Sequence, residues 1–353
     1  MDRHIKVINA LEIEHNLTTK DLAYLISDNR TEIIPSILGA ADRVRSKYVG
    51  NEVHLRGLIE FSNYCHNSCQ YCGLRGSNKS IERYRMSASD IVETAEKAAN
   101  LGLKTIVLQS GEDKFYSVEV LCSVIEEIKK LDVAVTLSIG ELATEDYANL
   151  KTAGADRFLL RIETTEPELY KRLHPGMSIE NRKRCLYDLK ALGYEVGTGC
   201  LAGLPGQTPL MLAKDLKFFK ELDADMIGIG PFIPCPGTPL ENETGGSVQL
   251  ALKMIALTRL MLPGINIPAT TALAAKDEEG YKKGLECGAN VIMPNMGKNE
   301  YRELYKIYPG KGSAEVNVKT CLDAIKELIV KEGRIVGKGE GNRQGFNLTK
   351  RQS

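Results

Sequence analysis

The chain has 353 residues, 43% of them hydrophobic, which is enough to bury a sizeable core. Lys plus Arg and Asp plus Glu both total 46, so the basic excess that nucleic acids and anionic membranes attract is missing, and neither partner is expected. The sequence contains no run of about 18 apolar residues, so no membrane-spanning helix is predicted. The first residues form a mixed-charge helical pattern unlike a signal peptide, so we expect a cytoplasmic protein.

Residues 1–50 show helical periodicity and predict an N-terminal helical extension. From residue 51 onward, short β-rich runs alternate with longer amphipathic helices, several of which end at a glycine cap. Eight strands are predicted, at 53–62, 105–111, 133–140, 157–164, 195–204, 226–234, 265–273 and 290–295.

Eight repeats of strand and helix predict an α/β fold, a complete (β/α)8 TIM barrel over residues 51–310. An open doubly wound sheet is the alternative, but no strand precedes a glycine-rich dinucleotide turn. The chemistry of such barrels lies where the strands end. Residues 311–353 form a C-terminal extension, and we expect its polar, glycine-rich stretch 338–353 to fray.

Three of the nine cysteines, Cys65, Cys69 and Cys72, lie in one loop with the spacing C-x3-C-x2-C. The loop follows the first predicted barrel strand and therefore lies on the catalytic face. Thiolates bind iron in iron-sulfur clusters, and a four-iron cluster commonly takes four protein ligands. Because no fourth cysteine is near in sequence, one iron is expected to keep an open position.

Zinc is the alternative for this loop. Structural zinc sites show paired C-x2-C knuckles or a nearby histidine as a further ligand. His66 lies inside the loop, but it neighbours Cys65, and two adjacent residues rarely reach one ion. Tyr71, just before the last cysteine, has two interpretations: it packs over a bound cofactor, or it shields the cluster.

Polar side chains gather where the second, third and fourth predicted strands end. Successive side chains of a strand point to opposite faces. Thr136 and Ser138 therefore share one face of the third predicted strand, and Arg161 and Glu163 share one face of the fourth. Buried unpaired charge is costly, so Arg161 and Glu163 indicate a site, with a structural ion pair as the alternative. The second strand ends with Gln109, Ser110, Gly111 and Glu112.

The cysteine spacing after the first strand of such a barrel resembles the radical SAM superfamily, and the resemblance covers about residues 50–310. It implies that Cys65, Cys69 and Cys72 hold one 4Fe-4S cluster whose open iron binds S-adenosyl-L-methionine. Cleavage of that cofactor would give a 5'-deoxyadenosyl radical.

The same resemblance implies roles at the strand ends. Gly111 and Glu112 would bind the methionine amino group, and Glu163 the ribose or amino group. Arg182 would pair with the methionine carboxylate, although a solvated helix arginine is the alternative interpretation. The cofactor-binding set is completed by Tyr71, Gln109, Ser110, Thr136, Ser138, Arg161 and Met226.

Segments spread over the barrel, among them YCHNSCQYCGLRGSNKSIERYRM, TIVLQSGED, GIGPFIPCPGTPL and NVIMPNM, resemble the HydE family of FeFe-hydrogenase maturases. This implies a substrate made by HydG, an iron complex carrying carbon monoxide, cyanide and cysteine. The product, a precursor of the diiron subcluster, would pass to HydF, and ferredoxin or flavodoxin would donate electrons. Arg161 and five further residues are the substrate-site candidates: Thr270, Thr271, Met293, Asn295 and Tyr305.

One departure concerns a second cluster that some members of the family carry on three cysteines. Here Ser313 and Ala324 occupy two of those positions, and Cys321 alone matches. One cysteine cannot hold a cluster, so a single 4Fe-4S site is expected.

Three other functions stay open. One is an amino-acid mutase like methylornithine synthase, and another is sulfur chemistry like that of biotin synthase. The third is a cluster carrier without catalysis. The strand-end set of Gly111, Glu112, Glu163 and Arg182 argues against the carrier, which has no use for a nucleoside pocket.

Overall fold

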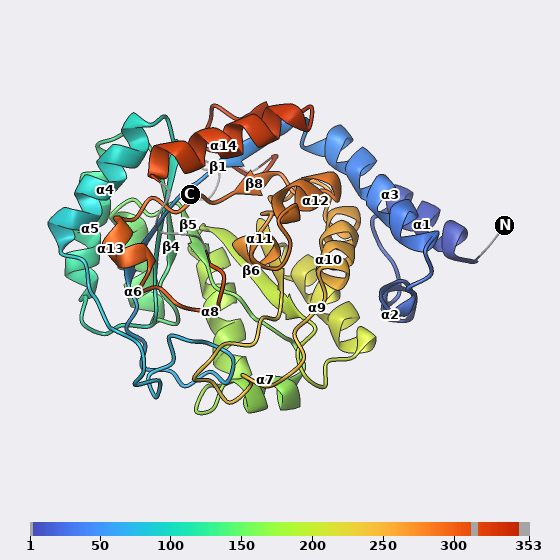
Figure 1. Cartoon of the computed structure of the whole chain (residues 1–353), viewed down its shortest axis with the longest axis horizontal. Helices are drawn as coiled ribbons and strands as arrows, with labels where there is room; N and C mark the ends of the chain where they lie inside the picture. The colour runs from blue at the N-terminus through green and yellow to red at the C-terminus, as the bar shows by residue number, and fades with distance from the viewer. Residues whose placement is uncertain (1–2, 312–316, 346–353) are drawn as a thin grey trace.

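The computed structural model describes residues 3–311 and 317–345 (Figure 1). Six parallel strands form one sheet in chain order, as expected for strand-helix-strand units whose crossovers keep one hand. None of the helices in these two ranges is both long and apolar enough to cross a membrane. The strands are β2 (Gly57–Ser62), β3 (Thr105–Ser110), β4 (Ala134–Ser138), β5 (Arg157–Leu159), β6 (Glu195–Ala202) and β7 (Met226–Pro231).

Helices surround this sheet and cover its outer face (Figure 1). Several begin at a serine or threonine whose hydroxyl accepts a backbone N–H of the first turn, as Ser87, Ser117 and Thr208 do. The helices that follow the six strands are α4 (Ala88–Asn100), α5 (Val118–Lys129), α6 (Thr144–Thr152), α7 (Pro167–Leu173), α8 (Ile179–Ala191), α9 (Pro209–Glu221) and α10 (Val248–Met261).

A second, three-stranded sheet has the order β8 (Val291–Ile292), β1 (Glu52–Leu55), β9 (Ile335–Val336). The strand predicted at 53–62 is therefore two strands, which separate at the buried Arg56. The last helices are α11 (Thr271–Lys276), α12 (Gly280–Glu286), α13 (Asn299–Arg302) and α14 (Val318–Lys331), of which α14 contacts β9 of this sheet.

The complete barrel is confirmed only in part, as an α/β fold with six parallel strands in one sheet. No regular strand occupies 265–273, and β8 has two residues instead of the six predicted. Isolated parallel bridges connect the two sheets here, pairing Met226 with Asn266, Pro268 with Val291, and Leu58 with Asn295.

The N-terminal extension is helical, as predicted, with α1 (Arg3–Glu14), α2 (Thr19–Ser27) and α3 (Ile33–Tyr48). It packs beside the barrel, with α3 against α10 and α2 against α9. Buried Leu11, Leu22 and Ile37 belong to the same hydrophobic core as the barrel strands and helices. The extension is therefore continuous with the barrel core.

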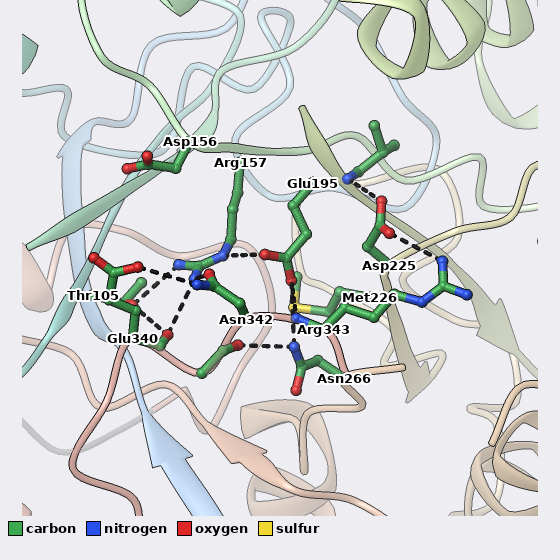
Figure 2. Close-up of polar contacts among 12 residues, drawn as sticks. Thr105, Asp156, Arg157, Glu195, Asp225, Met226, Asn266, Glu340, Asn342 and Arg343 are labelled. Atoms are coloured by element: carbon green, nitrogen blue, oxygen red, sulfur yellow. Dashed lines mark hydrogen bonds and ion pairs between the residues drawn. The ribbon is translucent and has the colours of Figure 1, made fainter. Parts of the chain in front are cut away.

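The C-terminal segment 338–345 lies across the base of the barrel, where the strands begin (Figure 2). The carbonyl of Glu340 accepts hydrogen bonds from Thr105 and Arg157 at 2.8 and 3.2 Å. The carbonyl of Gly341 accepts from Arg56 at 2.9 Å. The expectation of fraying is wrong for these residues, because buried groups on several strands hold them; residues 346–353 lie outside the described part.

Candidate functional site

A cavity of about 330 Å³ opens at the carboxyl ends of the strands. It brings together residues from the cysteine loop, from β3, β5 and β7, and from the segments near β8. Ten of the predicted site residues line it: Cys69, Tyr71, Cys72, Gln109, Arg161, Glu163, Met226, Thr270, Thr271 and Met293.

The cysteine loop packs tightly on the end of β3 at Gly111. A β-carbon at Gly111 would lie 2.2 Å from the carbonyl oxygen of Tyr64 and 2.7 Å from Cβ of Cys65. A β-carbon at Gly73 would meet the carbonyl of Lys306 at 2.0 Å. Only glycine allows backbones to approach this closely, so these two positions fix where the loop lies.

The three loop thiols are free and half-buried, and the donor set fits an iron-sulfur cluster. Burial raises the pKa of Cys65 and Cys69, and that of Cys72 to about 12. Thiolates in such surroundings need a cationic partner, which iron supplies. Among the described residues, no three His, Cys, Asp or Glu side chains converge on a single metal ion. In a four-iron cluster each cysteine binds a different iron, and convergence is not needed.

Tyr71 is held by a histidine that the sequence did not indicate. His174 is buried, and burial lowers its pKa to about 3, so the ring is neutral. Its Nδ1 lies 3.0 Å from the carbonyl of Tyr170 and must donate to it. Nε2 therefore accepts the hydroxyl of Tyr71, 2.9 Å away. Tyr71 is fixed at the cavity wall by this bond.

Arg161 and Glu163 lie together in the cavity wall, Nη2 to Oε2 at 3.1 Å. Arg161 also donates to the carbonyl of Cys200 at 2.6 Å. Burial raises the pKa of Glu163, whose buried Oε2 makes this ion pair but accepts no hydrogen bond of regular geometry. Its backbone has a φ of 62°, a strained conformation for a residue other than glycine and one that clusters at functional sites.

Arg182 is buried, so it is not a solvated helix arginine. From α8 it reaches Glu141 at 2.7 Å and Glu112 at 3.7 Å. Desolvation opposes the charge of Arg182, but the Tyr170 hydroxyl and the two carboxylates raise its pKa above the ordinary value. A cluster of charged side chains therefore lies beside the cysteine loop. It consists of Arg182, Glu112 and Glu141, and the sequence did not indicate Glu141.

The remaining predicted residues lie around the cavity without lining it. Ser110, Gly111 and Glu112 close β3, whereas Thr136 and Ser138 lie on β4. The buried Thr136 hydroxyl has no hydrogen-bond partner. Cys65 and Arg182 likewise do not line the cavity. Asn295 and Tyr305 line two other cavities, of about 490 and 580 Å³ respectively.

Sequence analysis missed a buried carboxylate, Glu60, and a lysine, Lys311, that pair inside the barrel. Glu60 lies within the largely apolar run 53–62, and Lys311 lies in a turn with the sequence PGKG. An acidic residue within a strand that is otherwise apolar was the available signal.

The region where a second cluster would lie is described only in part. Cys321 on α14 is half-buried and lines the cavity of about 490 Å³ with Ala324. Ser313 lies outside the described residues.

Comparisons with known proteins show the family of the chain. The Radical SAM superfamily model matches residues 59–219, and the Biotin and Thiamin Synthesis associated domain matches 229–327. The FeFe hydrogenase maturase subunit HydE of Thermotoga maritima is 50% identical over 339 residues, covering 96% of this chain and 97% of the relative. The chain belongs to the HydE family. It is therefore a radical SAM enzyme, and its family implies a 4Fe-4S cluster and S-adenosyl-L-methionine.

Relatives outside HydE share the fold. The 3-methylornithine synthase of Methanosarcina acetivorans is 34% identical over 80% of this chain and 82% of its own length. The crystal structure of methylornithine synthase (PylB) has a TM-score of 0.81 at 27% identity, covering 94% of this HydE family member and 97% of that chain. The hydrogenase maturase HydG also reaches 0.81, but at 19% identity it supports the fold alone.

Proposed function

We propose that this HydE family member converts an iron complex carrying carbon monoxide, cyanide and cysteine into a precursor of the diiron subcluster of FeFe-hydrogenase. The observation that carries the proposal is the 50% identity to HydE over nearly the whole of both chains. The iron complex would come from HydG, the product would go to HydF, and a ferredoxin or flavodoxin would supply electrons.

Cys65, Cys69 and Cys72 would hold the single 4Fe-4S cluster, in keeping with three half-buried thiols on one tightly packed loop. Held by these three thiolates, the cluster would supply the electron for reductive cleavage of S-adenosyl-L-methionine to a 5'-deoxyadenosyl radical. The chain's own part is to exclude water and to hold the cofactor next to the cavity.

Charged residues around the loop suit the cofactor's charged ends. Arg182 would meet the methionine carboxylate, since arginine binds carboxylates in a bidentate manner. The backbone of Gly111 and Glu112 would accept the amino group, and Glu163 would accept from the ribose or amino group. Tyr71, Gln109, Ser110, Thr136, Ser138, Arg161 and Met226 would complete the cofactor site.

The substrate would occupy the cavity of about 330 Å³, whose lining includes Thr270, Thr271 and Met293. Arg161 is a cation in the same wall, suited to an anionic complex. Asn295 and Tyr305 would act from the edge of the site, since they line neighbouring cavities.

The domain division belongs to the same proposal: a helical extension (1–50), a barrel (51–310) and a C-terminal extension (311–353). The bridged segments near Asn266 and Asn295 would serve as the seventh and eighth members of a complete (β/α)8 barrel.

The test is anaerobic reconstitution followed by reaction with the synthetic iron complex, S-adenosyl-L-methionine and dithionite. We expect 5'-deoxyadenosine release that rises with the complex, and product that activates apo-hydrogenase through HydF. A Cys72→Ser variant should lose both. Release unaffected by the complex, or no activation, would contradict the proposal.

A mutase like methylornithine synthase is the second candidate, favoured by the 34% identity and the TM-score of 0.81. It would rearrange L-lysine under the same reducing conditions. A hydrogenase maturase leaves L-lysine unchanged, so this single incubation separates the two functions.

A further inference from the structure

Lys311 lies at the junction of three cavities. It is the one residue shared by the linings of the cavities of about 330, 490 and 580 Å³. The side chain is 9% exposed, although Lys311 lies in the stretch of chain between α13 and α14. The ammonium group of Lys311 therefore borders all three cavities.

The ammonium group pairs with Glu60, which is on β2 and only 2% exposed. An ammonium has three N–H donors. Among the described residues, Glu60 is the one hydrogen-bond acceptor of Lys311, and the Tyr305 ring lies below Nζ at 4.2 Å. Two donors are therefore available for a ligand. Burial lowers the pKa of Lys311, so a further anion nearby would stabilise its charge.

Glu60 does not depend on Lys311 alone. Asn295 donates to its Oε2 at 2.6 Å, and Gln109, its neighbour on β3, donates to its Oε1 at 3.4 Å. If Lys311 turned to another anion, Glu60 would keep two hydrogen-bond donors. The cost of leaving a buried carboxylate unpaired would be reduced accordingly.

Arg161, the other cation of the inner cavity, has less freedom. It is held by Glu163 at 3.1 Å and by the carbonyl of Cys200 at 2.6 Å. Lys311 is thus the cation with spare donors and a carboxylate partner that is supported from elsewhere.

We infer that Lys311 is an anion-binding residue of the inner cavity, and that Glu60 is its counter-ion until a small anionic ligand takes that place. The inference rests on the proposed function, because the iron-cyanide complex is such an anion. Lys311 would recognise the ligand's negative charge where it enters, opposite Arg161. Glu60 would compete with the ligand and thereby weaken its binding.

If Glu60 competes with the ligand for Lys311, substitutions at the two residues should change the affinity for the ligand in opposite directions. Lys311→Met removes the cation and should weaken binding of the synthetic iron complex about 10- to 100-fold, the range expected for a hydrogen bond to a charged group. Glu60→Gln keeps one acceptor oxygen, for Asn295, and removes the competing charge, so it should tighten binding several-fold. Lys311→Arg should stay close to the wild type.

Binding is measured by isothermal titration of the cluster-loaded, S-adenosyl-L-methionine-bound protein without reductant, so that no turnover occurs. Lys319→Met, which removes an exposed lysine from α14, is the control and should leave affinity unchanged. Circular dichroism and iron content establish that each variant is folded and loaded. If Lys311→Met does not fold, Glu60→Gln still decides.

Unchanged affinity in Lys311→Met would overturn the inference, as would weaker or unchanged binding in Glu60→Gln. Equal weakening in both variants is the result expected of a merely structural ion pair. A wild-type protein that does not bind the complex at all would instead contradict the proposed function, so the two failures are distinguishable.

Discussion

Asp215 is a fully buried carboxyl group on α9 that the proposed chemistry does not use. One oxygen accepts the backbone N–H and the hydroxyl of Thr165, both at 2.6 Å. The other oxygen has no hydrogen-bond partner. Thr165 follows Glu163, so Asp215 anchors the strained turn that aims Glu163 at the cavity. Burial outweighs these hydrogen bonds and raises the pKa of Asp215 to about 7.

This raised pKa predicts a pH-dependent stability. Between about pH 4 and pH 7 the native state holds a proton on Asp215 that the unfolded chain has released, so stability falls as pH rises. Asp215→Asn cannot ionise. From pH 5 to pH 7.5 the wild type should lose about 2–3 kcal/mol more unfolding free energy than the variant, at about 1.4 kcal/mol per pKa unit.

Urea denaturation at the two pH values measures this difference. Asp323→Asn, at an exposed position on α14, is the control and should follow the wild type. If the Asp215→Asn and wild-type stabilities run parallel over this range, the carboxyl is already ionised and the assignment is wrong.

At residue scale, sequence predicted which strand ends carry chemistry, but not how the side chains are held. The spacing of the cysteines and the alternation at Arg161 and Glu163 are local features. His174 and Asp215 sit in ordinary helical patterns, and their burial comes from neighbours on other elements. Local patterns contain no information about those neighbours.

At the scale of elements, the C-terminal segment is the main departure from the sequence prediction. Its glycines and polar residues are typical of a disordered tail. In the structure its carbonyls instead accept from buried arginines such as Arg56 and Arg157, while Arg343 donates to Asp225 at 3.0 Å (Figure 2). These partners lie more than 100 residues away in sequence, so no local pattern could predict them.

Two glycines of this segment give a matched test. Gly341 has a φ of 67°, and a β-carbon there would lie 2.5 Å from Cγ of His54. Gly339 has nothing within 4 Å of the same atom. Gly341→Ala should lower the unfolding free energy by about 1–3 kcal/mol, because of backbone strain and the clash. Gly339→Ala should stay within about 0.5 kcal/mol of the wild type.

Urea denaturation gives the free energies, and limited proteolysis reports whether the segment detaches from the barrel base. We expect faster cleavage only in Gly341→Ala. Equal behaviour of the two variants would mean that the segment contributes nothing to the closure of the base.

At the scale of the whole molecule, the six-stranded sheet was predictable because strand-helix units alternate regularly. The last two strands were overpredicted for a definite reason. Pro268 and Pro294 lie in the segments 265–273 and 290–295, and proline has no N–H to donate to a sheet. Apart from the two residues of β8, pairing there is reduced to isolated bridges. The apolar pattern correctly predicted that these segments are buried, but it wrongly predicted the regular hydrogen bonding of a strand.

The distribution of cysteines over the molecule gives the last prediction, a single cluster. Cys321 lies on α14 and lines the cavity of about 490 Å³ with Ala324. Cys235 lies nearer the loop, 2.8 Å from where a β-carbon at Gly73 would be, but it lines the cavity of about 580 Å³. Anaerobic reconstitution should therefore give about four irons per chain, the content of one 4Fe-4S cluster.

Variants separate the possible ligands. Cys72→Ala should lose the cluster absorbance, because the cluster cannot remain on two thiolates. Cys235→Ala and Cys321→Ala should keep about four irons, since neither thiol is expected to bind iron. Clearly more iron in the wild type, with the excess lost in Cys321→Ala, would establish a second site on α14. Loss of iron in Cys235→Ala would identify Cys235 as a fourth ligand. The cluster would then have no open iron, and the proposed mode of cofactor binding would be wrong.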